Sequence, residues 1–147
     1  MVRGCVGRAV PARRYHVTLA FLGDLPAEQA DRIPTMTSVA SPGFDLVFDR
    51  FGSFGRGPRV LWIGPGECPK ELATLVGQLR VELDDAGVGY DRRDFKPHVT
   101  LARKVTKLPE LQPPQPVFWP VREFVLVESR STADGPAYEV RRRYPIG

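Results

Sequence analysis

Residue types that mark particular protein classes are scarce in this chain of 147 residues. It has two cysteines, Cys5 and Cys68, too few for the disulfide framework of a small secreted domain or for a cysteine-rich zinc cluster. No apolar run approaches the roughly 20 residues that a membrane-spanning helix requires. The basic segment at the start lacks the continuous apolar stretch of a secretory signal. These absences predict a cytoplasmic protein that does not span a membrane.

Histidine is equally scarce, and its two copies stand in the same five-residue context. The string HVTLA occupies residues 16–20 and again residues 98–102. A chance repeat of five residues has a probability on the order of one per cent in a chain of this length. Coincidence is therefore the poorer explanation. The length of the chain fits one domain, or two small lobes that share a core.

The bulk composition is that of an ordinary globular protein. Hydrophobic residues make up 42% of the chain and charged residues 26%, which excludes a disordered or fibrous chain. The formal net charge is +4. This surplus of positive charge favours anionic partners but says nothing about the fold.

Hydrophobic periodicity and turn residues predict several strands and two helices. Apolar residues fall at helical spacing over residues 69–87, where Gly87 is a natural end. Residues 26–33 fit a short helix that begins at a proline. The residues ahead of the first HVTLA contain no convincing element. This pattern predicts an α+β fold with antiparallel sheets. Strands are expected at residues 15–22, 44–51, 58–64, 98–103, 122–129 and 137–146.

Each HVTLA copy can present an imidazole and a hydroxyl on the same face of a strand. Side chains at i and i+2 share a face, so His16 lies with Thr18 and His98 lies with Thr100. Two such strands side by side would suit an in-line displacement at phosphorus. A neutral imidazole accepts the proton of the attacking oxygen, and a protonated imidazole donates to the leaving oxygen. The threonine hydroxyls would hydrogen-bond to the non-bridging oxygens.

A structural role or a metal-binding role for the histidines fits the residues less well. A single His-x-Thr on a strand is commonly a half-buried structural histidine, but the identical second copy argues against that role. A catalytic zinc site generally needs three protein ligands, whereas each copy supplies one histidine and no carboxylate at ligand spacing. We therefore expect neither a metal nor any other cofactor.

The two motifs and their flanks resemble the 2H phosphoesterases, specifically the bacterial and archaeal RNA 2′,3′-cyclic phosphodiesterases, historically called 2′-5′ RNA ligases. HVTLAFLGDL is similar to the family's first motif, RVLWIG to its middle strand and FKPHVTLAR to its second motif. FVLVESRSTADGPAYEVRRRYPI is similar to its closing strands, so the resemblance covers nearly the whole chain. It implies one domain of two lobes over residues 1–147, with an α+β fold. Two antiparallel sheets would be related by pseudo-twofold symmetry around a central cleft.

The resemblance implies hydrolysis of RNA 2′,3′-cyclic phosphate ends, or of nucleoside 2′,3′-cyclic phosphates, to 2′-phosphomonoesters. It assigns His16 as the proton donor to the leaving 3′ oxygen and His98 as the proton acceptor that activates water. The residues alone leave these two roles interchangeable. Thr18 and Thr100 would bind the phosphate. Arg103 stands where the family often has a phosphate-binding basic residue. Strict alternation would turn Arg103 away from His98, so this role requires a bulge or a strand end.

Aromatic and basic residues elsewhere admit two interpretations each. Phe21, Phe51 and Phe54 are candidates to stack on a base, although aromatic residues near strands more often belong to the core. The run of three arginines at residues 141–143 could contact RNA phosphates. As part of an edge strand, it could instead be solvent-facing charge that deters edge pairing.

The chain departs from the family pattern at its start. Family members usually open with a strand and a helix ahead of the first motif, and the resemblance implies a fold that lacks both. If the absence is genuine, a sheet would be left with an exposed edge and a thinner core, which would invite dimerisation or instability. The residues themselves do not fix the oligomeric state.

Two alternatives to hydrolysis remain open. A binding module could recognise nucleotides or RNA ends with the same hydroxyls and basic residues, but binding alone does not require two groups that titrate near neutrality. Ligation of RNA through a 2′-5′ bond would run related chemistry in reverse, and the residues do not determine the direction.

Overall fold

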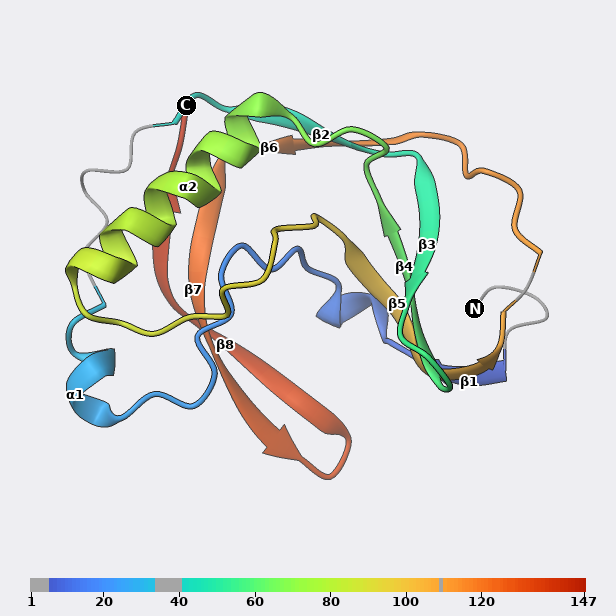
Figure 1. The fold of residues 1–147 in the computed structure, drawn as a ribbon, viewed down its shortest axis with the longest axis horizontal. Helices are drawn as coiled ribbons and strands as arrows, with labels where there is room; N and C mark the ends of the chain where they lie inside the picture. The colour runs from blue at the N-terminus through green and yellow to red at the C-terminus, as the bar shows by residue number, and fades with distance from the viewer. Residues whose placement is uncertain (1–5, 34–40, 109) are drawn as a thin grey trace. The chain divides into compact units, whose positions relative to one another are not determined.

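The computed structural model describes residues 6–33, 41–108 and 110–147 (Figure 1). Its elements in chain order are β1 (Val6–Ala9), a 3-10 helix (Ala12–Arg14), α1 (Ala27–Ala30), β2 (Phe44–Phe48), β3 (Arg50–Phe54), β4 (Arg59–Gly64), α2 (Lys70–Asp85), β5 (Val99–Lys107), β6 (Val117–Val121), β7 (Glu123–Thr132) and β8 (Gly135–Pro145). The described strands form a four-stranded sheet in the order β1-β5-β4-β3 and two pairs, β2-β6 and β7-β8, where the resemblance implied two sheets. The strands of the four-stranded sheet and of the β7-β8 pair run antiparallel, so the predicted α+β class is confirmed.

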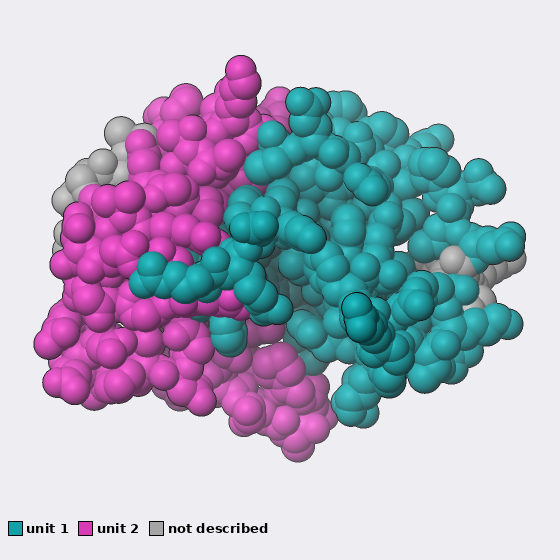
Figure 2. All heavy atoms as spheres, in the orientation of Figure 1, with its two compact units in different colours: residues 1–21, 46–68, 92–119 teal, residues 22–45, 69–91, 120–147 magenta. Residues whose placement is uncertain are grey.

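The chain divides into two compact units (Figure 2). The four-stranded sheet belongs to unit 1, whereas α1, α2 and the β7-β8 hairpin belong to unit 2. Pseudo-twofold symmetry, and a missing first strand and helix, stay predictions. Unit 1 comprises Met1–Phe21, Leu46–Cys68 and Arg92–Trp119, and unit 2 comprises Leu22–Asp45, Pro69–Asp91 and Pro120–Gly147.

The predicted strand at residues 15–22 is wrong, because the structure has only a single antiparallel bridge there, between Val17 and Val99. The same edge of β5 is already paired to β1, which the sequence did not reveal. Val10 donates its N–H to the Leu101 carbonyl over 2.8 Å, and the chain then leaves β5 through the 3-10 helix. Because β1 pairs with the later part of this edge, the first HVTLA copy pairs with the start of β5, at Val99. The first HVTLA copy is therefore an edge segment and not a full strand.

The predicted strand at residues 44–51 divides at Asp49 into β2 and β3. The Asp49 N–H donates to the Gly64 carbonyl over 3.1 Å, and its carboxylate accepts from the Gly66 N–H over 2.7 Å. These bonds hold Asp49 against the end of β4, and the chain changes partner at this point. β2 pairs with β6, which was not expected after the proline-rich connector, and β3 forms the expected hairpin with β4.

The helix over residues 69–87 is confirmed as α2. It begins after Pro69 and ends before Gly87, whose φ of +70° lies in the region that favours glycine. The short helix at residues 26–33 is confirmed in part, as α1. No helix in the described part of the chain is long and apolar enough to cross a membrane. The buried side of α2 is made by Leu72, Leu75, Val76, Leu79 and Leu83.

The strands expected at residues 98–103, 122–129 and 137–146 are confirmed as β5, β7 and β8. In unit 1, β5 is central to the sheet and contributes the buried residues Ala102 and Val105, which pack with Leu61 of β4. This packing fixes which face of β5 turns inward, and so which of its side chains remain available for chemistry.

Candidate active site

Both HVTLA copies lie in unit 1, and the bridge between their central valines fixes their register. That register sets His16 opposite Thr100 and Thr18 opposite His98, with each opposed pair pointing away from the valines. The valine of the second copy is buried, while the four polar side chains are exposed or half-buried. His16 and His98 are diagonal neighbours in this register, a relation that sets two Cα atoms about 7–8 Å apart in an antiparallel pair. The structure therefore brings the four predicted side chains together on one face of unit 1.

Each imidazole is held by the backbone two residues before it. Nδ1 of His16 lies 2.7 Å from the Arg14 carbonyl oxygen, and Nδ1 of His98 lies 2.6 Å from the Lys96 carbonyl oxygen. A carbonyl oxygen can only accept, so Nδ1 is the donor in both rings. With Nδ1 occupied, proton exchange with a substrate falls to Nε2 in both histidines. The two copies thus repeat one ring orientation as well as one sequence.

β5 departs from strict alternation between Thr100 and Ala102. The adjacent β4 residues Trp62 and Leu61 stand opposite Thr100 and Ala102, so β5 carries one extra residue there. Ala102 is buried against the core, and Arg103 therefore points to the face that carries Thr100. The bulge that a phosphate-binding Arg103 requires is present. The role itself stays a prediction.

Two aromatic rings accompany the imidazole of His98. The centroid of Phe54 lies 4.9 Å from that of His98 in an edge-to-face arrangement, and the centroid of Trp62 lies 6.2 Å away. The indole of Trp62 covers Gly52 so closely that a Cβ at Gly52 would lie 2.1 Å from it. These contacts restrict the orientation of the imidazole. The sequence reasoning missed Trp62, although its pairing with Gly52 across the β3-β4 hairpin follows once the hairpin register is known.

The other two phenylalanines proposed for base stacking have different surroundings. Phe51 stands opposite Ile63, on the face of β3 that turns away from Trp62, so it is not positioned beside His98. Phe21 is 64% exposed, and its role stays a prediction.

The arginines of residues 141–143 lie on β8 in unit 2. Arg141 forms ion pairs with Glu128 and Glu139, and Arg143 pairs with Glu123 over 2.7 Å. Hydrogen bonds from Arg141, and then from Arg130, hold the pKa of the Glu128 carboxyl below its ordinary value. These ion pairs support the interpretation of the run as surface charge on a strand.

The two units carry opposite net charge. The sequence of unit 1 has 13 lysines and arginines against 4 acidic residues, a net charge of +9. The sequence of unit 2 has 8 basic residues against 13 acidic ones, a net charge of −5. The unit that holds both histidines is therefore the one that attracts anions.

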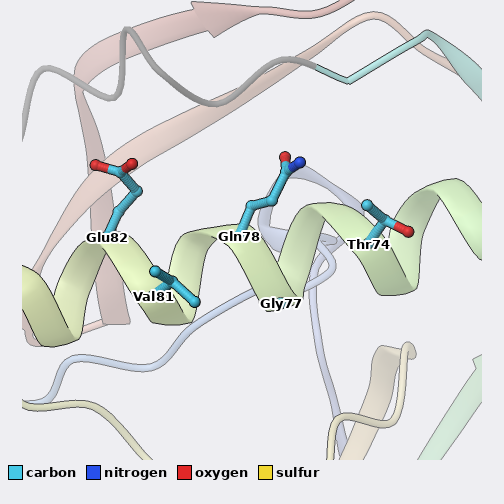
Figure 3. A pocket seen from close by; sticks show the side chains of 5 residues that line it. All are labelled: Thr74, Gly77, Gln78, Val81 and Glu82. Carbon is cyan, nitrogen blue, oxygen red and sulfur yellow. The ribbon is translucent and has the colours of Figure 1, made fainter.

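A shallow pocket with a volume of about 390 Å³ lies along α2 (Figure 3). It contains none of the predicted site residues, and it belongs to unit 2. In the described part of the chain, no group of three or more histidine, cysteine, aspartate or glutamate side chains could hold a metal ion. The pocket is lined by Thr74, Gly77, Gln78, Val81 and Glu82.

The chain is similar to known proteins of one family. The chain is 32% identical over 142 residues to the RNA 2′,3′-cyclic phosphodiesterase of Escherichia coli K12, covering 95% of this chain and 80% of that protein. It is 33% identical over 142 residues to the protein of the same name from Archaeoglobus fulgidus, covering 90% and 80%. The crystal structure of E. coli LigT complexed with 3′-AMP superposes with a TM-score of 0.85 at 32% identity, over 95% of this chain and 81% of that one. The model of the 2′-5′ RNA ligase superfamily matches residues 5–133, and the chain belongs to that family.

Proposed function

We propose that the chain hydrolyses 2′,3′-cyclic phosphate ends of RNA to 2′-phosphomonoesters by acid–base catalysis from two histidines, without a metal. The observation that carries the proposal is the antiparallel bridge between Val17 and Val99, whose register turns both His-x-Thr pairs to one face. The relatives named RNA 2′,3′-cyclic phosphodiesterase support the substrate, and the LigT complex with 3′-AMP supports a nucleotide ligand.

His98 enters the reaction as a neutral imidazole. Its Nε2 accepts a proton from water while the water oxygen bonds to phosphorus. On the opposite side the bond between phosphorus and the 3′ oxygen breaks, and protonated His16 donates its proton to that oxygen. The product carries a 2′-phosphate and a free 3′ hydroxyl. Proton exchange with solvent returns His98 to the neutral form and His16 to the protonated form.

The remaining site residues act on the phosphate itself. Thr18 and Thr100 flank the imidazoles in the register and donate hydroxyl hydrogen bonds to the non-bridging oxygens. Arg103 extends from the bulge toward the same face, where its guanidinium stabilises the charge of the pentacovalent phosphorus.

The test is the product formed from adenosine 2′,3′-cyclic monophosphate by purified protein in EDTA. The expected product is adenosine 2′-monophosphate alone, identified by chromatography against the 3′ isomer. A 3′-phosphate product would contradict the leaving-group assignment, and loss of turnover in EDTA would contradict the metal-independent mechanism. Tight binding without any product would favour the nucleotide-binding module. A 2′-5′ linked product with an added 5′-hydroxyl RNA would favour ligation.

We also infer that the protein works in the cytoplasm, where RNA ends are available. The scarcity of cysteine supports a reducing compartment.

A further inference from the structure

A second arginine stands directly beside Arg103. In the antiparallel register of β1 and β5, Arg8 is the cross-strand partner of Arg103, and Ala9 is the partner of the buried Ala102. Directly opposed residues share a face, so Arg8 points to the face that carries Arg103, Thr100 and the histidines. Both arginines are exposed.

This pairing places like charges opposite each other. Opposed like charges destabilise a sheet, and in the described residues neither Arg8 nor Arg103 forms an ion pair. In the β7-β8 hairpin, by contrast, Arg130 and Arg141 form ion pairs with Glu139 and Glu128 of the opposite strand. An unneutralised arginine pair on the catalytic face is suited to an anion supplied by the ligand.

The backbone around Arg8 is held in a defined place. A Cβ at Gly7 would lie 2.9 Å from the Val105 side chain and 3.0 Å from the Arg103 carbonyl oxygen, so β1 approaches the irregular part of β5 unusually closely. On the other side of Arg8, the Val10 N–H is bonded to β5. Arg8 is therefore presented from a fixed edge strand and not from a loop.

The separation of the arginine pair from the reacting centre fits a second phosphate. Arg103 is three residues along β5 from Thr100, at most about 10 Å at the rise of an extended strand. β1 lies one strand spacing further toward the edge of the sheet, about 4.8 Å. Arg8 stands on the edge of β5 that also carries the first HVTLA segment, three register positions from His16, so it lies about as far from the cyclic phosphate as Arg103 does. One of the two arginines can therefore contact the cyclic phosphate while the other takes the next phosphate of the chain.

We propose that Arg8 binds the phosphodiester next to the cyclic phosphate, so that the preferred substrate is an RNA chain and not a single nucleotide. The proposal rests on the proposed function of the histidine site. A 2′,3′-cyclic phosphate terminates the 3′ end of its strand, so the phosphate that Arg8 binds joins the terminal nucleotide to its 5′ neighbour. A mononucleotide lacks this group.

The experiment compares two substrates with the same terminal adenosine 2′,3′-cyclic phosphate, the mononucleotide and a trinucleotide. Wild-type protein should have the higher kcat/KM for the trinucleotide. In Arg8→Gln the ratio of the two kcat/KM values should fall on the order of tenfold, the worth of one charge-assisted hydrogen bond. The slope of log kcat/KM against log salt for the trinucleotide should become shallower by about 0.7.

Arg59→Gln is the matched control, because Arg59 is an exposed arginine of the same sheet on the face of Leu61, away from the site. It removes the same charge and should leave the ratio unchanged. The melting temperature of Arg8→Gln should equal or exceed that of wild type, since the substitution removes a like-charge contact.

An unchanged ratio in Arg8→Gln, or an equal loss on both substrates, would overturn the proposal. Failure of the proposed function is a separate result, namely that wild-type protein turns over neither substrate. In that case fluorescence polarisation of a labelled trinucleotide with a terminal 2′-phosphate still tests Arg8. Arg8→Gln should then bind this probe on the order of tenfold more weakly than Arg59→Gln, and equal affinities would overturn the proposal.

Discussion

The arginines of the β7-β8 hairpin in unit 2 and the arginine pair of the sheet in unit 1 differ in their partners. In the β7-β8 hairpin of unit 2, Arg141 and Arg143 form ion pairs with glutamates of the same hairpin. In the sheet of unit 1, Arg103 faces Arg8, and both point to the side that carries the two histidines. The modest net charge of the whole chain conceals this separation, since unit 1 is strongly basic and unit 2 is acidic. Charge that is balanced inside the fold stabilises a strand pair, whereas charge left unbalanced on a catalytic face is available to a phosphate.

The largest difference between the units is expected in catalysis. His98→Ala or His16→Ala should lower kcat on adenosine 2′,3′-cyclic monophosphate by on the order of 10²–10⁴-fold, because each removes one proton-transfer group. Thr74→Ala, in the α2 pocket of unit 2, should leave kcat within experimental error. Turnover of both histidine variants at the wild-type rate would contradict the acid–base roles. A comparable loss of kcat in Thr74→Ala would indicate that the α2 pocket takes part in catalysis.

The same substitution should have opposite effects on stability in the two units. Gly52→Ala in β3 forces a Cβ into the indole of Trp62 and should destabilise the protein by about 1–3 kcal/mol. Gly77→Ala in α2 meets no atom within 4 Å and should stabilise it by about 0.5–1 kcal/mol, because alanine favours the helix. Urea unfolding of the two variants measures both changes. A Gly52→Ala variant as stable as wild type would mean that Trp62 does not lie against β3.

The smallest effect concerns the ion pairs of unit 2. The pKa of Glu128 is lowered, and a carboxylate of this kind stabilises the fold above its unfolded pKa and loses that contribution as the pH falls through its folded pKa. Arg141→Gln should raise the pKa of Glu128 toward its ordinary value, as followed by carbon-13 NMR of the carboxyl group. Arg142→Gln, on the neighbouring residue, should leave it unchanged. An unaltered Glu128 midpoint in Arg141→Gln would mean that the hydrogen bond does not persist in solution.

The residues of the candidate site could be predicted because they repeat. The repeat of HVTLA identifies His16, Thr18, His98 and Thr100 as candidates without knowledge of the fold. In the structure, the bridge between Val17 and Val99 brings the two copies side by side. The helix α2 was equally accessible, since its five buried residues follow one face of a helix and its ends carry Pro69 and Gly87.

The features that the sequence did not reveal depend on packing between strands. β1 has four exposed residues and no apolar alternation, so nothing local marked it as a strand. The sequence shows that a phosphate-binding Arg103 requires a bulge, but it cannot locate one. A bulge is defined by the pairing of two strands, and the alternation of side chains along one strand does not reveal it. Arg8 was missed for both reasons. Its significance comes from its register against Arg103 and not from its neighbours in sequence.

The central claim is that both imidazoles turn Nε2 toward one phosphate. Nitrogen-15 NMR tests it directly, because the chain has only two histidines and its spectrum therefore contains imidazole signals from only two rings. In their neutral form both rings should carry the proton on Nδ1, and adenosine 2′-monophosphate should shift both Nε2 resonances along one binding curve. A proton on Nε2 in either ring, or a nucleotide that shifts one ring and leaves the other unchanged, would contradict the account.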